Sequence, residues 1–157
     1  MFNKVFGNNE KLDLQFNDNT LVGNLSNVDA YTETKSTGYQ KSLTNITFNN
    51  VQLDSSSKEY IAATILHEVV HAWINYKYTA VVSNQYQHSL MAGSYRFNLM
   101  RIALQEMYPN LSTEDAIDLT WGGLTDTVEF SGLPVNERQR IISKNIDFKK
   151  GLKGTHC

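Results

Sequence analysis

The sequence has almost no cysteine, no long apolar run and no excess of either charge. Its single cysteine, Cys157, excludes an internal disulfide framework. No stretch approaches the roughly 20 apolar residues that span a bilayer, and the first residues lack the apolar run of a signal peptide. The 14 Lys and Arg against 16 Asp and Glu, a net charge of -2, argue against a nucleic-acid partner, which needs a concentrated positive face.

No linker rich in proline, glycine or serine divides the chain. With 41% apolar residues, its 157 residues suit one compact domain with an adequate core. We therefore expect residues 1–157 to form a single domain, either alone or as the C-terminal part of a longer protein. The compartment stays open between a secreted or delivered protein and a cytoplasmic one, because a well-packed exported domain needs no disulfide.

Short alternating patterns near the start of the chain predict strands, and helical spacing follows them. The predicted strands are Leu12–Phe16, Val28–Thr34 and Ile46–Leu53, the last with a turn at Asn49-Asn50. The predicted helices run from a cap within Asp54–Ser57 to Tyr78, from Tyr86 to Tyr108, from Ser112 to Trp121, and from Pro134 to Ser143. Strands first and helices after indicate an α+β fold with a small N-terminal antiparallel sheet.

The most informative segment is His67-Glu68-Val69-Val70-His71, within a helix that is apolar nearly all round. Residues four apart on a helix are separated by about 40° around its axis, so both imidazoles can bind one metal ion. Glu68 lies beside the ligands, where it can take a proton from a metal-activated water and deliver it to a leaving amine. The alternative is a chance pattern, but burying these groups without a partner is unfavourable. The segment therefore indicates a zinc-dependent peptidase.

A catalytic zinc site takes three protein ligands and keeps one position open. His88, at the head of the next predicted helix, is the best candidate for the third ligand; its alternative is an ordinary helix N-terminal histidine. The rival ligands are Glu106, Asp126, Glu129 and His156. Asp126 and Glu129 are also candidates to hold the free N–H of a ligand imidazole, and the sequence does not choose between them.

Two further features allow a chemical and a packing interpretation. Tyr95, two turns after His88 on the predicted helix, can donate its hydroxyl to the oxyanion, or it is a core residue. The glycines of Trp121-Gly122-Gly123-Leu124 can let the backbone approach the active site. We favour the other interpretation of this string, a helix end with a tryptophan in the core.

The strings Thr64–Trp73 and His88–Met91 resemble the SprT-like family of zincins, over roughly Ile46 to Met91. The resemblance implies that His67, His71 and His88 bind Zn²⁺ and that Glu68 is the catalytic base.

The same resemblance implies that the strand Asn45–Asn49 is an edge strand that pairs with an extended substrate. The string Gln87-His88-Ser89 departs from the Gly-His-Gly that the family often has. One cysteine is also too few for the zinc ribbon of many members. Together with the net charge, this argues against the DNA-linked role found in the family.

The segments between Met91 and Thr127 resemble a variant from Bacteroidetes-type bacteria, in which the zincin forms the C-terminal part of long secreted or toxin-like proteins. This resemblance implies an antibacterial effector that acts on a protein or peptide and has a cognate immunity or inhibitor protein. The alternative from another class is a non-catalytic structural zinc or protein-interaction domain, in which Glu68 is dispensable.

Overall fold

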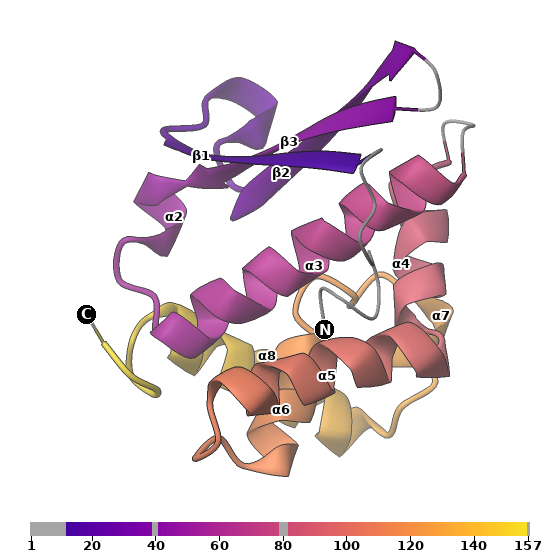
Figure 1. The fold of residues 1–157 in the computed structure, drawn as a ribbon. Helices are drawn as coiled ribbons and strands as arrows, with labels where there is room; N and C mark the ends of the chain where they lie inside the picture. Colours follow the sequence, from indigo (N-terminus) through magenta and orange to yellow (C-terminus); the bar gives the residue numbers. More distant parts are fainter. Residues whose placement is uncertain (1–11, 39–40, 79–81, 157) are drawn as a thin grey trace. The chain divides into compact units, whose positions relative to one another are not determined.

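The computed structural model describes residues 12–38, 41–78 and 82–156. Three strands come first and helices follow (Figure 1), which confirms the predicted α+β class. The chain forms two compact units, and both include part of helix α3 (Lys58–Lys77). One unit contains the strands and α3 from Glu68 onward, and the other contains α3 through His67 and the chain from Ser83 onward. Within the described ranges, no helix is both long and apolar enough to cross a membrane.

The first unit holds a mixed three-stranded sheet, in the order β1-β3-β2. Its strands are β1 (Leu12–Asn19), β2 (Ala30–Gly38) and β3 (Lys41–Asn49). Strands β2 and β3 are antiparallel, as predicted, but β1 runs parallel to β3. The prediction of an entirely antiparallel sheet is therefore wrong for this pair. Alternation in the sequence shows which side chains share a face of a strand, but not which strand lies beside it or in which direction.

Strand β3 is the central strand of this sheet. Its residue Ile46 pairs with Phe16 of β1 on one side and with Thr32 of β2 on the other. The prediction that residues 45–49 form an edge strand for a substrate is therefore wrong, and the edges of the described sheet are β1 and β2. The sheet buries one face, where Thr44 and Ile46 are fully buried.

Strand β3 ends at Asn49, where the predicted continuation through Val51–Leu53 is replaced by the helical turn α2 (Asn50–Leu53). The buried amide of Asn49 donates to the carbonyl oxygens of Ser26 and Val28 at 3.1 and 3.0 Å. These bonds tie the strand end to the segment that contains the 3-10 helix η1 (Gly23–Leu25). Because they join residues far apart in the sequence, a local pattern does not reveal them.

Helix α3 has close to its predicted bounds. Ser57 is its cap, since its hydroxyl accepts the N–H of Tyr60 at 3.2 Å. Glu59 lies in the first turn, where a negative charge is favourable. Five of the apolar side chains in its middle and second half are buried as predicted, Leu66, Val69, Val70, Ala72 and Ile74, whereas Ile65 and Trp73 are half-buried.

The described part of the second unit contains more helices than predicted. Where one helix was expected from Tyr86 to Tyr108, the structure has α4 (Asn84–Ala92) and α5 (Ser94–Met107). They are separated by Gly93, whose ψ of 135° is not helical. Glycine has a low helix propensity, which favours a break at this position. The remaining helices are α6 (Thr113–Thr120), α7 (Val128–Ser131) and α8 (Val135–Lys149). Helix α7 was not predicted, and α8 extends beyond its predicted end. Helix α6 packs against α5 and α8, and α4 against α5 and α7.

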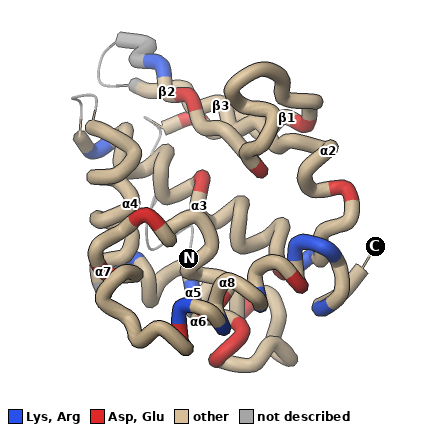
Figure 2. The backbone as a smooth tube through the Cα atoms, turned by 180° about the vertical axis from the view of Figure 1, so that it is seen from behind, with Lys and Arg blue, Asp and Glu red and all other residues tan. Residues whose placement is uncertain are grey.

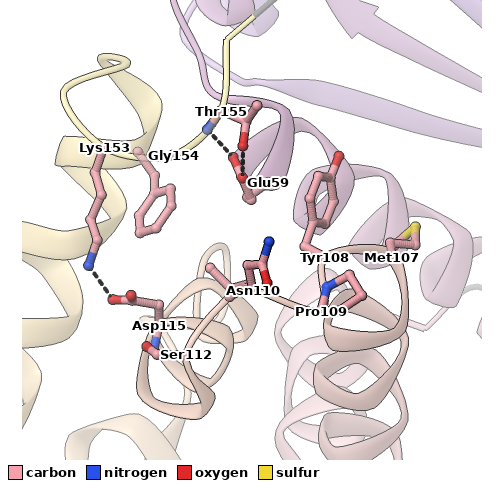
Figure 3. Close-up of a pocket in the computed structure, with 12 residues that line it drawn as sticks. Glu59, Met107, Tyr108, Pro109, Asn110, Ser112, Asp115, Lys153, Gly154 and Thr155 are labelled. Carbon is pink, nitrogen blue, oxygen red and sulfur yellow. Dashed lines mark hydrogen bonds and ion pairs between the residues drawn. The ribbon is translucent and has the colours of Figure 1, made fainter.

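The C-terminal tail, residues 150–156, binds the first turn of α3. Thr155 donates to the carboxylate of Glu59 through its N–H at 2.7 Å and its hydroxyl at 2.6 Å. Gly154, at φ +93°, permits this approach because a Cβ there would lie 2.5 Å from the Glu59 Oε2 atom. These residues border a cavity of about 390 Å³ (Figure 3), whose lining includes none of the predicted zinc ligands.

Asp115, in the first turn of α6, is the centre of an ion-pair cluster. Its Oδ1 atom accepts from the Nζ atoms of Lys144 and Lys153, each at 2.6 Å. Figure 2 shows basic residues close to acidic ones around α6, α8 and the tail. Burial by itself raises the pKa of Asp115, but the hydrogen bonds from the two lysines outweigh it and lower the pKa to about 2.

Asp115 should stabilise the folded protein only while it is ionised. An unfolded aspartate has a pKa of about 3.9, so the unfolded chain takes up this proton first as the pH falls. The free energy of unfolding should then decrease by about 2 kcal/mol between about pH 4 and pH 2. Denaturant titrations across this range should show that Asp115→Asn removes this part of the pH dependence. The control is Asp54→Asn, which removes an exposed carboxylate; an unchanged pH dependence in Asp115→Asn contradicts the assignment.

Candidate metal centre

Helix α3 places His67 and His71 one turn apart, as the spacing predicts. His71 is buried and His67 is half-buried. Because the helix is continuous through both residues, their imidazoles leave the same face.

Helix α4 supplies His88. The helix is capped by Ser83, whose hydroxyl accepts the N–H of Tyr86 at 3.3 Å. The ring centroid of His88 lies 5.3 Å from that of His67, with the planes inclined by 60°. The His88 Nδ1 atom lies 2.8 and 2.9 Å from the two carboxylate oxygens of Asp126. A carboxylate only accepts, so Nδ1–H donates, and in the neutral imidazole Nε2 then has a lone pair for a metal ion.

The three histidines form a group that can hold one metal ion. One ligand atom from each of His67, His71 and His88 lies within 4.8 Å of the others. Neutral imidazoles are ligands that zinc takes, and three of them leave a fourth coordination position for water or substrate. The donor set therefore fits a catalytic zinc ion. Within the described residues this group contains no carboxylate, and Glu68 follows its first member on α3.

Glu68 is buried, with 8% of its surface exposed. The hydroxyl of Thr32 in β2 donates to its Oε2 atom at 2.5 Å. Burial raises the pKa of Glu68 to about 7; the Thr32 hydrogen bond opposes this rise, and the negative charge of Asp29 adds to it. A carboxylate in such an environment has a proton affinity suited to taking up and releasing a proton near neutral pH.

The model of the SprT-like family matches residues 4–89 of the chain, which is 86 of its 157 residues. The chain belongs to the SprT-like family. The match includes His67, Glu68, His71 and His88 and begins well before the predicted start at Ile46. No curated protein and no solved structure matches the chain significantly.

Beyond the region matched by the SprT-like family, Gly123 contacts the site. It has φ +79°, and a Cβ there would lie 2.8 Å from the Cε1 atom of His67. The favoured interpretation of the Trp121–Leu124 string, a helix end with a tryptophan in the core, is confirmed. Helix α6 ends there, and Trp121 packs against Phe97 and Phe130. The other interpretation stays a prediction, and the approach of the Gly123 backbone to His67, a predicted metal ligand, is consistent with it.

Asp126 also lies outside the SprT-like match. The structure resolves the choice that the sequence left open, since Asp126, and not Glu129, holds the His88 imidazole. None of the rival ligands belongs to the group that the three histidines form in the described part of the chain. These rivals are Glu106, Asp126, Glu129 and His156.

Tyr95, the predicted donor to the oxyanion, makes no contact with the three histidines among the described interactions. Its side chain is 69% exposed in the first turn of α5. The argument from helical spacing no longer applies, because Gly93 separates Tyr95 from the helix that carries His88. Its role as an oxyanion donor stays a prediction.

Sequence reasoning missed Thr32, the partner of Glu68. Thr32 is one of several threonines in a polar strand, and its position opposite Glu68 depends on tertiary structure. A positive φ is common for a glycine at a helix end, so the Trp121–Leu124 string could have predicted it for Gly123. The string does not show that Gly123 lies against His67.

We expect the Asp126 contact to raise metal affinity by fixing the orientation of His88. Asp126→Ala should weaken zinc binding by about 10- to 100-fold, the usual effect of removing the carboxylate behind a ligand imidazole. Competition with a chromogenic chelator measures this affinity. Glu129→Ala, which removes an exposed carboxylate nearby in sequence, is the matched control. Equal affinities of the Asp126→Ala variant and the unaltered protein contradict the assignment.

Gly123→Ala should disturb the same group of histidines through His67. A left-handed alanine is strained by about 1 kcal/mol, and its methyl group also pushes against the His67 ring. We expect a lower melting temperature in the metal-free form and a weaker affinity for zinc. Gly132→Ala is the control, because Gly132 has φ -76° and its added Cβ makes only contacts of 3.5 Å. If both variants bind zinc equally well, the Gly123 approach has no bearing on the site.

Proposed function

We propose that this SprT-like protein is a zinc-dependent peptidase. The proposal is carried by one arrangement, the group of His67, His71 and His88 with Glu68 next to the first ligand on the same helix. A zinc ion bound by these histidines would supply Lewis-acid activation of a water molecule and of the scissile carbonyl.

Glu68 would carry the proton. Its carboxylate takes a proton from the attacking water and later delivers it to the nitrogen of the leaving amine. Its burial supports this role, because electrostatic interactions are stronger where water is excluded. Asp126 would keep the His88 imidazole in the tautomer and orientation that ligation requires.

The substrate would be an extended stretch of a protein or peptide. Edge strands bind such segments through main-chain hydrogen bonds, with side chains setting the selectivity. The strand that pairs with this segment would be an edge of the sheet, in place of residues 45–49.

Replacing Glu68 tests the proposal against the alternative of a non-catalytic zinc domain. Glu68→Gln should keep stoichiometric zinc and the fold but lower peptidase activity by at least about 100-fold, the contribution typical of a general base. The measurement is cleavage of unfolded protein substrates with mass-spectrometric detection, beside metal analysis of each variant. His67→Ala should lose zinc as well as activity, and Glu106→Gln is the control for an exposed glutamate.

Two outcomes contradict the proposal. If Glu68→Gln cleaves as fast as the unaltered protein, Glu68 is not the base. If the unaltered, zinc-loaded protein cleaves none of the substrates, the structural zinc domain becomes the better interpretation.

A further inference from the structure

The carboxylate of Glu68 is held by a residue from a different element. Strand β2 alternates, so that Thr32 and Thr34 are half-buried while Tyr31, Glu33 and Lys35 are exposed. From the half-buried side, the Thr32 hydroxyl donates to Glu68 Oε2 at 2.5 Å. One carboxylate oxygen thus has a fixed donor, and the other is left for exchange of a proton.

A proton-transferring carboxylate has to lie within hydrogen-bond reach of the water that it deprotonates, at roughly 2.6–3.2 Å. A glutamate side chain rotates about three bonds, and displacement of a catalytic group by about 1 Å is enough to reduce the rate strongly. Helix α3 fixes only the backbone of Glu68, because helix geometry leaves the outer torsions free. The Thr32 contact supplies the missing restraint.

We propose that Thr32 is a positioning residue for catalysis, whose hydroxyl orients Glu68 for proton transfer. The inference rests on the proposed peptidase function and adds a residue to it. In this role Thr32 acts through Glu68.

The alternative is that Thr32 only satisfies a buried carboxylate and has no effect on the reaction. The same strand provides a contact to separate the two possibilities. The Thr34 hydroxyl accepts from the Asn75 side chain at 3.2 Å and shares a hydrogen bond with Thr44 at 2.8 Å. Asn75 lies two turns after Glu68 on α3. The Thr34 contact therefore joins the same strand to the same helix without touching the base.

The experiment compares Thr32→Val, Thr32→Ser and Thr34→Val in the zinc-loaded full chain. Valine has nearly the shape of threonine but no hydroxyl. Thr32→Val should lower kcat by about 10- to 100-fold, the range that one misplaced catalytic group costs, with unchanged KM and zinc content. Thr32→Ser restores the hydroxyl and should recover kcat to within about threefold of the original value. Thr34→Val should leave kcat unchanged.

A Thr32→Val, Glu68→Gln double variant distinguishes the failure of this inference from the failure of the proposed function. If Thr32 acts through Glu68, the double variant should be no slower than Glu68→Gln alone, because residues that act as a unit are not additive. The inference is overturned if the two losses multiply, if Thr34→Val lowers kcat equally, or if Thr32→Val keeps the original kcat. Full activity in Glu68→Gln overturns the role of Glu68 as the base and this inference with it, whereas absence of cleavage by the unaltered, zinc-loaded protein overturns the proposed function itself. Should Thr32→Val not fold, Thr32→Ala replaces it in every arm.

Discussion

Helix α3 has to hold two imidazoles and a carboxylate within a stretch that is otherwise apolar and buried. Groups of this kind are tolerated in an interior only when each has a partner. The structure provides a different kind of contact for three of the polar groups of the site. Glu68 accepts from a hydroxyl of β2, His88 donates to a carboxylate that precedes α7, and the ring of His67 lies against a backbone without a side chain. The motif supplies the reactive groups, and the surrounding elements orient them.

The parts of the site that depend on local spacing were predictable from the sequence. His67 and His71 share a face because they are four residues apart on a helix, and α3 was recognisable from its cap and its apolar residues. His88 was reached by a chemical argument, since a catalytic zinc ion takes a third protein ligand. The local half of the fold was predictable for the same reason, including the alternating residues of β1 and the beginning and end of α6.

What was not predictable depends on which elements become neighbours. The alternation within β3 was readable, but its central place between β1 and β2 was not, and the substrate strand was assigned wrongly for that reason. The break at Gly93 was missed because a single glycine is often tolerated inside a helix. Asp126 and Glu129 are both acidic and close in sequence, and only the packing of α4 against α7 brings one of them to His88.

The contacts to the predicted metal ligands and the contact to the predicted base involve separate residues. Asp126 and Gly123 act on imidazoles, whose orientation determines how strongly a metal ion is held. Thr32 acts on a carboxylate that is not in the ligand group, so its loss leaves the metal donors unchanged. If the proposed function holds, affinity for the metal and rate of turnover are therefore open to independent variation in this chain. Asp126 and Gly123 both lie beyond residue 89, where the SprT-like match ends, whereas Thr32 lies within the match.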